Sequence, residues 1–436
     1  MKRFAAAALW LTACGDANLA PGPADGSSPV VDASPVPDEA SPGTSDATAE
    51  RDAAADAGGA ADAGLPSGEG GADAACAGAT VPPATLSCTG LYADIATKTL
   101  APGVRSYQPA VPLWSDGAQK ARWIELPPGT QIDASNPSEW SFPVGTKVWK
   151  EFSRNGNRVE TRLFQKIDDG PPPYWVHATY AWNADDSEAI ASAGGDITLE
   201  GDGGAYHIPT FSECEQCHDG RTDHILGFEQ ISLGLAGAQG LTLPELVSEG
   251  LIAPAPARTS LAIGDDGTGA AAPALAWIHI NCGVTCHNAN SNATAYGAGM
   301  LLRLDPALLD GRQVTISAFD PLRTTIGVPA TSPGWIQPVH WDRIVPGDPG
   351  DSLLVQLISN RGTNNPVGAQ MPPIASSIVD TVDVASVVDW VSKMPPAIDA
   401  GVVDATVGTP GDAQTDATTG DAGDEPAIED AAAQNE

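Results

Sequence analysis

Two short clusters of cysteine and histidine could carry out chemistry in this chain. The first motif is Cys214-Glu215-Gln216-Cys217-His218, and the second motif is Cys282-Gly283-Val284-Thr285-Cys286-His287. Two cysteines three residues apart lie on one face of a helical turn, so both sulfurs can reach the two vinyl groups of one porphyrin. The histidine that follows is then held beneath the iron. The first motif therefore predicts a covalently attached c-type haem with His218 as an iron ligand.

The second motif has one more residue between its cysteines, Cys282 and Cys286. A spacing of four residues is also about one helical turn, so both sulfurs stay on one side. Gly283 makes the extra residue tolerable because glycine has wide conformational freedom. We therefore expect a second covalent haem c, with His287 as its iron ligand.

Two other readings of these cysteines remain open. A zinc site could be built from Cys214, Cys217, Cys282 and Cys286, or from the cysteines and histidines of both motifs. Alternatively, each pair could form a short-range disulfide. A zinc site needs neither a histidine after both pairs nor an export signal, so the motif pattern favours haem.

Met and His are the common second axial ligands of haem iron. Met371 lies in Gln370-Met371-Pro372-Pro373, where two prolines with fixed φ stiffen the loop, and we assign it to the second haem. Met300 and Met394 could equally be residues that pack in the hydrophobic core and not iron ligands.

The second axial ligand of the first haem is left open. His279, His207 and His340 are the candidates, with Met300 or no ligand as alternatives. His177 lies in a predicted strand beside Trp175, and His224 is too close to His218 to cross the haem. Since a Met/His centre has a higher potential than a bis-His centre, we expect electrons to pass from the first haem to the second.

The N-terminus has the pattern of an export signal. Lys2 and Arg3 are followed by an apolar run, and Leu11-Thr12-Ala13-Cys14 resembles a bacterial lipoprotein lipobox. We expect residues 1–13 to be removed and Cys14 to be lipidated, which would anchor the protein to a membrane surface. The expected location is periplasmic, on the outer membrane or at the cell surface. In such an oxidising compartment, Cys76 and Cys88 should form a disulfide.

Composition divides the chain into six parts. Residues 14–80 and 397–436 are rich in Ala, Asp, Gly and Pro, have no apolar period, and should be disordered. Between them we expect a β-rich domain (81–200), a first haem region (201–272) and a second, cytochrome c-like haem domain (273–396). The net charge of −34 argues against nucleic acid as a partner and permits a basic redox partner protein.

The β-rich part carries clear strand signals. Polar and apolar residues alternate over 147–152 and again over 158–164, with Asn155-Gly156 between them as a tight turn, which predicts a hairpin. Residues 174–182 predict another strand of the same kind. Six tryptophans lie here, and a core or sheet-face role is favoured over a ligand surface. An antiparallel, sandwich-like fold fits this pattern.

Short helices are expected after residue 200. Ser212 and Glu215 predict a capping box for a helix at the first motif. Residues 273–287 predict a helix that runs into the second motif. Residues 378–394 predict a closing helix, with Val382, Ala385, Val388 and Val391 at helical spacing. The expected class is α+β, with an antiparallel β-rich domain followed by a mainly helical dihaem region.

Several further segments resemble known families. Pro346-Gly347-Asp348-Pro349 and Gln370–Pro373, together with the haem motif, resemble the cytochrome c superfamily. His279–Cys282, Cys286–Asn288 and the segments at 113–118, 142–146 and 160–163 resemble bacterial lipoprotein dihaem cytochromes, over roughly residues 85–395. The resemblance implies a small helical haem domain with histidine ligands and a role in electron transfer.

We therefore expect a dihaem electron carrier with no catalytic residues of its own. A dihaem peroxidase or other haem oxidoreductase is an alternative, because the first haem lacks an evident second ligand. A third alternative is that the β-rich domain binds a partner or sugar through Leu113–Ala118 and the haems are accessory; a turn at Asp116-Gly117 explains that segment more simply.

Overall fold

The protein is described here by a computed structural model that covers residues 76–198, 205–312, 315, 318–330, 340–363, 365 and 367–396. The predicted signal peptide, Cys14, residues 14–75 of the predicted linker and the whole predicted C-terminal segment, 397–436, lie outside these described residues. No helix in the described ranges is long and apolar enough to cross a membrane.

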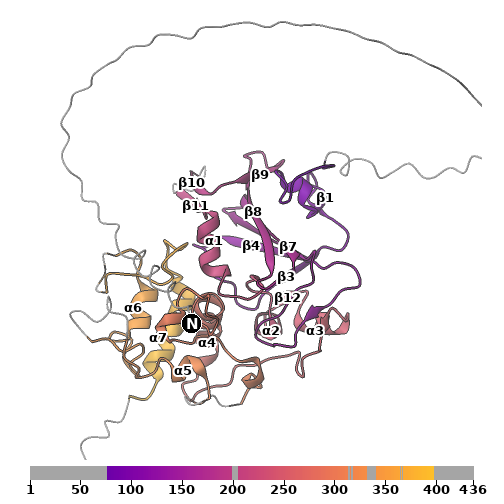
Figure 1. Cartoon of the computed structure of the whole chain (residues 1–436). Coiled ribbons are helices and arrows are strands. Elements are labelled where there is room, and N and C mark those ends of the chain that lie inside the picture. Colours follow the sequence, from indigo (N-terminus) through magenta and orange to yellow (C-terminus); the bar gives the residue numbers. More distant parts are fainter. Residues whose placement is uncertain are drawn as a thin grey trace, which may run out of the picture. The chain divides into compact units, whose positions relative to one another are not determined.

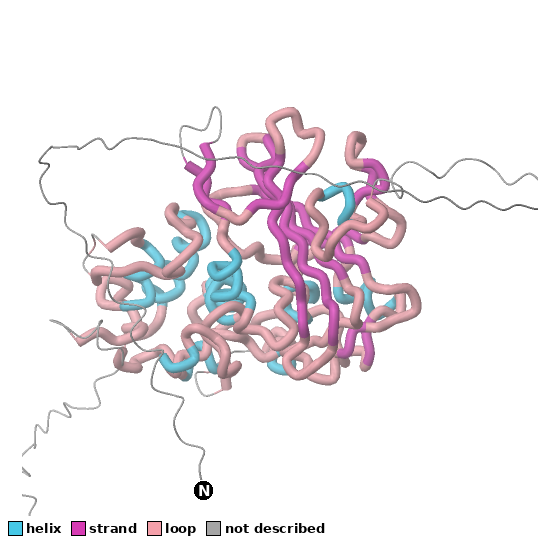
Figure 2. Tube along the Cα trace, turned by 45° about the horizontal axis from the view of Figure 1, so that its top comes forward, coloured by secondary structure: helices cyan, strands magenta, loops and turns pink. Residues whose placement is uncertain are grey.

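A seven-stranded antiparallel sheet organises the first half of the described chain, in the order β12-β3-β4-β6-β7-β8-β9. Its strands are seen side by side in Figure 2. Their bounds are β3 (Arg105–Gln108), β4 (Gln119–Glu125), β6 (Lys147–Arg154), β7 (Asn157–Asp168), β8 (Tyr174–Trp182), β9 (Ala189–Ser192) and β12 (Gln239–Gly240). Three two-stranded sheets accompany it: β1 (Tyr92–Asp94) with β2 (Thr99–Leu100), β10 (Gly195–Thr198) with β11 (Ala205–Ile208), and β5 (Ile132–Asp133) with β13 (Ile252–Ala253).

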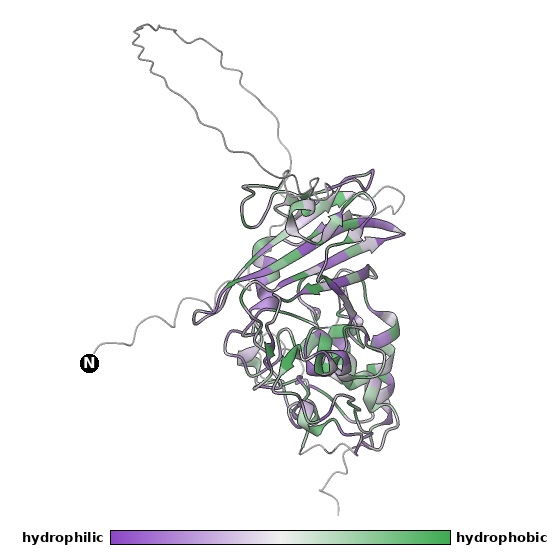
Figure 3. Ribbon diagram, turned by 90° about the vertical axis from the view of Figure 1, so that its right-hand side faces the viewer, coloured by the Kyte–Doolittle hydropathy of each residue, from purple (hydrophilic) through white to green (hydrophobic). Residues whose placement is uncertain are grey.

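The predicted hairpin is confirmed. Strands β6 and β7 pair antiparallel, and Asn155 and Gly156 between them both have positive φ, at 50° and 83°. Two consecutive positive φ values are what a tight hairpin turn requires, and Asn and Gly adopt them at little cost. Strand β8 has the predicted bounds, 174–182. Hydrophilic and hydrophobic stretches are mixed along the strands of this sheet in Figure 3.

Short helices follow the sheet, as predicted, so the mixed α+β class is confirmed. They are α1 (Phe211–His218), α2 (Gln230–Gly234), α3 (Leu243–Ser248), α4 (Ala271–Ile278), α5 (Asp320–Arg323), α6 (Leu353–Ser359) and α7 (Thr381–Lys393). Single turns are η1 (Leu86–Thr89), η2 (His279–Gly283), η3 (Tyr296–Ala298) and η4 (Pro306–Leu308). In Figure 1, α4 to α7 gather on one side, and α1 lies between them and the sheet.

The closing helix α7 buries only part of the stripe that the sequence suggested: Val391 is buried and Val388 partly so, but Val382 and Ala385 are exposed. Val384, Val387 and Val391 are buried, together with Trp390, whereas Val382 is 77 % exposed. The helix begins at Thr381, where Asp380 accepts a hydrogen bond from the Asp383 backbone N–H. Trp390 selects the buried face, because it buries more apolar area than any valine and its indole N–H reaches Asp266 at 2.7 Å.

One core joins the sheet to the segment that carries the first motif. Phe228, fully buried, meets Tyr107 and Trp140 at ring-centroid distances of 4.7 and 6.2 Å. Strands β12 and β13, from the same segment, pair with β3 and β5. The described part of the first haem region, residues 205–272, therefore packs on the sheet and shares its core.

Replacing Phe228 with Ala tests this shared core. We expect Phe228→Ala to lower the free energy of unfolding by about 3–5 kcal/mol, because it removes a fully buried aromatic side chain. Chemical denaturation followed by both circular dichroism and tryptophan fluorescence measures the change. Tyr174→Ala, at a residue 57 % exposed, is the control and should cost far less. Equal effects of the two substitutions would contradict a core centred on Phe228.

Candidate functional site

The first motif lies on helix α1. Thr210 precedes the helix and forms a capping box with Glu213, whose carboxylate accepts a hydrogen bond from the Thr210 backbone N–H at 2.8 Å. The predicted capping pair, Ser212 and Glu215, is therefore wrong by two residues, because Ser212 already lies inside the helix. The helical turn places Cys214 and Cys217 three residues apart, with Cys214 buried.

His218 ends this helix as a neutral, oriented imidazole. Its Nδ1 lies 2.5 Å from the carbonyl oxygen of His224, and its ring stacks on Phe164 with centroids 4.3 Å apart. Burial lowers the pKa of His218 to about 3. The carbonyl accepts the proton of Nδ1, so the lone pair of Nε2 remains for a metal ion, which is how metal-ligating histidines are held in proteins.

The loop that supplies this carbonyl is fastened to the sheet by a buried ion pair. Asp223 lies 2.9 Å from the ammonium of Lys166 on β7, which is 1 % exposed, and accepts a hydrogen bond from the indole of Trp175 at 2.7 Å. Since Asp223 precedes His224 directly, these contacts set the position of the carbonyl that orients His218.

The second motif takes up its additional residue by a change of helix type. Helix α4 ends at Ile278 and continues as the π-helical turn η2, His279–Gly283. Two backbone bonds span five residues instead of four: Val284 N–H to the His279 carbonyl and His287 N–H to the Cys282 carbonyl, both 2.8 Å. A π-turn adds one residue without breaking the helix, and such turns are frequent at functional sites.

Gly283 is needed here for space as well as for flexibility. An added Cβ would overlap the backbone of Leu302 and Arg303. The carbonyl of Gly283 accepts a hydrogen bond from the Asn288 side chain at 2.9 Å, which ties the start of the motif to the residue after His287.

His287 is buried, at 7 % exposed, and burial lowers its pKa to about 4. An interaction with the Met300 backbone partly opposes this shift. A buried imidazole that stays neutral keeps a lone pair that can bind a metal ion. The chemistry of this side chain therefore fits a metal ligand.

An apolar cavity opens directly onto the second motif. Its volume is about 120 Å³. Cys282, Cys286 and His287 line it, and Met371 and Met300 line it as well. The rest of its wall is mainly apolar: Leu113, Trp114, Trp277, Leu302, Leu354, Leu357, Ile358, Pro372, Pro373, Ile374 and Ala375.

The structure thus brings Met371 together with the second motif across 84 residues of sequence (371 minus 287). The Met371 backbone N–H donates to the Leu357 carbonyl at 2.9 Å, which holds the loop against α6. Met300 shares the cavity, whereas Met394 is 5 % exposed in the core and does not line it.

A second, more polar cavity opens onto the first motif. Its volume is about 530 Å³, and Cys214, Cys217 and His218 line it. Three cations, Lys150, Arg154 and Arg162, also line it, together with the acids Asp116, Asp196 and Glu213. The lining of this cavity includes no methionine.

The two motifs are in direct contact. The Cys286 thiol donates a long hydrogen bond to the Gln216 carbonyl at 3.9 Å. The interaction between the Cys217 and Cys286 thiols raises the pKa of Cys217 and lowers that of Cys286. The Gln216 carbonyl accepts from the Thr294 hydroxyl at 2.6 Å. Gly220 packs so closely on the second motif that an added Cβ would overlap the carbonyl oxygen of Thr285. Groups bonded to Cys217 and Cys286 would therefore be neighbours.

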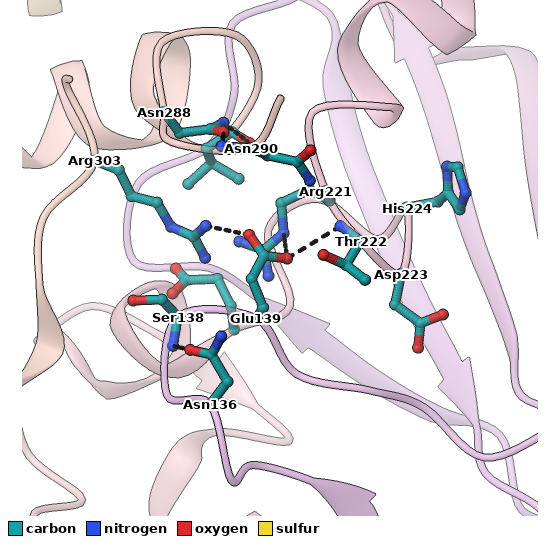
Figure 4. A network of polar contacts seen from close by, with 12 residues as sticks. Asn136, Ser138, Glu139, Arg221, Thr222, Asp223, His224, Asn288, Asn290 and Arg303 are labelled. Carbon is teal, nitrogen blue, oxygen red and sulfur yellow. Dashed lines mark hydrogen bonds and ion pairs between the residues drawn. The ribbon is translucent and has the colours of Figure 1, made fainter. Parts of the chain in front are cut away.

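Glu139 holds this junction from the sheet side (Figure 4). Its carboxylate pairs with Arg303, lies 3.5 Å from Arg221 Nε, and accepts a hydrogen bond from the Thr222 backbone N–H at 3.1 Å. Arg221 follows the first motif, and Arg303 lies beside the backbone that packs on Gly283. One carboxylate thus joins the surroundings of both motifs to the loop between β5 and β6.

The segment Leu113–Ala118 contributes to both cavities rather than to a separate ligand surface. The Trp114 backbone N–H donates to the Asn281 side chain at 2.7 Å, and its indole donates to the Ile378 carbonyl at 2.8 Å. Asp116 accepts hydrogen bonds from the backbone N–H groups of Ser377 and Ile378 at 2.9 and 3.0 Å. Trp114 and Asn281 are therefore site residues that sequence reasoning did not single out for this role.

The candidate second ligands of the first haem lie in different surroundings. His279 is fully buried, and its two ring nitrogens face the Leu304 backbone N–H at 3.0 Å and Glu229 at 3.4 Å. His207 lines the first cavity but is held between Asp196 and Glu213. His340 is exposed and lines neither cavity.

The structure also shows which cysteines form disulfides. Cys76 and Cys88 form the predicted disulfide. The four motif cysteines are free thiols, so the short-range disulfides are not formed. Among the described residues, no three His, Cys, Asp or Glu side chains come together in a group that could hold a metal ion.

The chain has no significant match among protein-family models, curated proteins or solved structures. Its function therefore rests on the residues and geometry of the site itself.

Gly220→Ala tests the contact between the motifs. The added methyl group must displace the Thr285 carbonyl, and we expect it to lower the free energy of unfolding by about 1–3 kcal/mol, the usual cost of overpacking. Thermal and urea denaturation measure the effect. Gly297→Ala is the matched control, because no atom lies within 4 Å of its added Cβ. A Gly220→Ala variant as stable as the control would contradict the close packing.

Proposed function

We propose that this chain is an exported, lipid-anchored dihaem c-type cytochrome that transfers electrons between redox partner proteins. The observation that carries the proposal is that each Cys-Cys-His motif opens onto its own cavity and that the two motifs touch at Cys217 and Cys286. A single attachment motif could arise by chance. Two such motifs with adjoining cavities form a pair of neighbouring attachment sites.

The residues present fit haem c at both sites. Cys214 and Cys217 would hold one haem through thioether bonds, and Cys282 and Cys286 the other. His287 is buried and His218 is half-buried, and their lowered pKa values leave both imidazoles uncharged at neutral pH, the state in which imidazole ligates iron. When bound, the two haems supply reversible one-electron chemistry.

The surrounding chain would hold each site in a fixed geometry and a defined polarity. The apolar wall of the second cavity excludes water, and Met371 and Met300 are the thioethers that line it. A low-polarity site with a methionine ligand favours the reduced state and so a higher potential. The proposed direction of electron transfer, from the first haem to the second, follows from this contrast with the polar first cavity. The cytochrome c-like character of residues 273–396 is part of the proposal.

The kind of redox partner is inferred from the net charge of the chain and from its proposed lipid anchor. The strongly acidic chain suits a basic redox protein, and lipidation of Cys14 would place the haems near a membrane surface.

One observation supports a second function, a peroxidase or another haem oxidoreductase. The first cavity is large and polar, and no methionine lines it. Besides His218, the histidine that lines it is His207, which is already bound by two carboxylates. Binding of cyanide to one ferric haem would favour this alternative, and the absence of any spectral change would remove it.

Cysteine variants test the proposal directly. In protein from a host with c-type maturation, we expect two haems per chain by pyridine haemochrome assay and haem staining after denaturing electrophoresis. Cys214→Ser with Cys217→Ser should leave one haem, and so should Cys282→Ser with Cys286→Ser. The control pair, Cys76→Ser with Cys88→Ser, should keep both, because that disulfide lies outside the cavities. Colourless wild-type protein from such a host would rule out the proposal.

Met371→Leu tests the assignment of the second haem's ligand. Losing a thioether ligand should lower the midpoint potential of one haem and leave the other unchanged. Potentiometric titration followed by absorbance measures both potentials. Met394→Leu is the control, since that residue is in the core and not in the cavity. If Met300→Leu lowers the potential and Met371→Leu does not, Met300 is the ligand instead.

A further inference from the structure

A row of cations crosses one face of the sheet. Arg122 on β4 pairs in register with Lys150 on β6, and Lys150 pairs with Arg162 on β7. Residues in direct register on neighbouring antiparallel strands point to the same face, so these three side chains lie next to one another. Lys120, two residues before Arg122, is on that face as well. We call these four residues the cationic row.

The cationic row is unfavourable by itself. Like charges directly opposite on neighbouring strands destabilise a sheet, and Arg122 is only 4 % exposed. Burial and the neighbouring cations lower the pKa of Lys120 to about 7 and that of Lys150 well below its usual range. In a chain with a net charge of −34, four cations in one partly buried row require an explanation.

The described residues neutralise the row incompletely. Glu160 accepts two hydrogen bonds from Arg162 and is the carboxylate bound to the row. Arg122 donates to the Gln108 side chain at 2.6 Å, and Lys120 donates to the Leu113 carbonyl. The Lys150 ammonium lies 5.0 Å from the ring centroid of Phe152 and donates to no acceptor among the described residues.

The acids in the first cavity do not supply the missing negative charge. Asp196 and Glu213 are bound to His207, and Asp116 is bound to backbone N–H groups of the loop at Ser377 and Ile378. Lys150 and Arg162 face the same cavity as Cys214, Cys217 and His218. The row therefore places the Lys150 amine, which donates to no acceptor among the described residues, beside the first motif.

We propose that Lys150 and Arg162 form a carboxylate-binding site for the propionate groups of the haem attached at Cys214 and Cys217. This inference rests on the proposed function. A carboxylate would accept the hydrogen bonds that Lys150 does not make within the protein, and it would offset the repulsion within the row. The sheet then contributes to cofactor binding, and its cations set the charge around the first haem.

Lys150→Gln, made in the Cys282→Ser, Cys286→Ser background so that only the first haem is present, tests the proposal. Removing a cation beside the haem favours the ferric state, so the midpoint potential should fall. We expect a shift on the order of tenfold in the reduction equilibrium constant, the size of one charge-assisted hydrogen bond. Resonance Raman bands of the propionates should shift in the same variant. Lys150→Arg keeps the charge and should restore both properties.

Lys147→Gln is the matched control. Lys147 lies on the same strand, three residues from Lys150 and so on the opposite face, and it pairs with Glu125 at 3.4 Å.

Attached haem with the same potential and Raman bands in Lys150→Gln and Lys147→Gln would overturn the carboxylate site and leave the proposed function standing. A wild-type chain without haem would overturn both. If Lys150→Gln fails to retain haem while Lys150→Arg retains it, the proposal is supported. An effect of added acetate on the wild-type potential that is lost in Lys150→Gln would assign the site to free carboxylates and contradict the propionate assignment.

Discussion

The contact between the two motifs is the constraint on which the rest of the site depends. Gly220 can approach the Thr285 carbonyl only because it has no side chain, and this approach brings the Cys286 thiol to 3.9 Å from the Gln216 carbonyl of the first motif. The two cavities adjoin as a result, and they share Leu113, Trp114, Cys217, Pro373, Ile374 and Ala375 in their walls. Moving the motifs apart would separate the cavities and remove the physical basis for two neighbouring redox groups.

Buried polar groups set the positions of the motifs around this contact. Two groups of ion pairs anchor the loops on either side of the contact between the motifs. One joins Asp223 to Lys166, and the other joins Glu139 to Arg221 and Arg303. Such buried ion pairs contribute little net stability compared with apolar packing, but breaking one leaves a charge without a partner. They are therefore better understood as devices that specify geometry. The same sheet supplies the cationic row, so its role extends from support to the charge of the first cavity.

Much of the local structure could be predicted from the sequence. The Asn155-Gly156 hairpin, strand 174–182, the Cys76–Cys88 disulfide and the short helices near both motifs follow from turn chemistry, alternation and residue spacing. The errors were also local. Thr210 and Glu213, not Ser212 and Glu215, cap α1, and the buried face of α7 is set by Trp390 rather than by the valine spacing.

The arrangement of the site could not be predicted in the same way, because it depends on contacts between distant residues. Gln216 and Thr294 lie 78 residues apart, and Trp114 and Asn281 lie 167 apart. Lys150 and Arg162 read as ordinary strand residues until their register is known. The additional residue of the second motif seemed to need only a flexible glycine; the π-turn shows that hydrogen bonding absorbs it, while Gly283 provides the space against Leu302.

The proposed function requires a haem covalently attached to each of the two cysteine pairs of one folded chain. Peptide mass spectrometry of purified wild-type protein tests it most directly, because each proteolytic fragment reports its own attachment. If the protein is a dihaem cytochrome, one haem will be found on the fragment that contains Cys214 and Cys217 and one on the fragment that contains Cys282 and Cys286. Unmodified cysteines in either fragment, in protein from a host that matures c-type cytochromes, would contradict it.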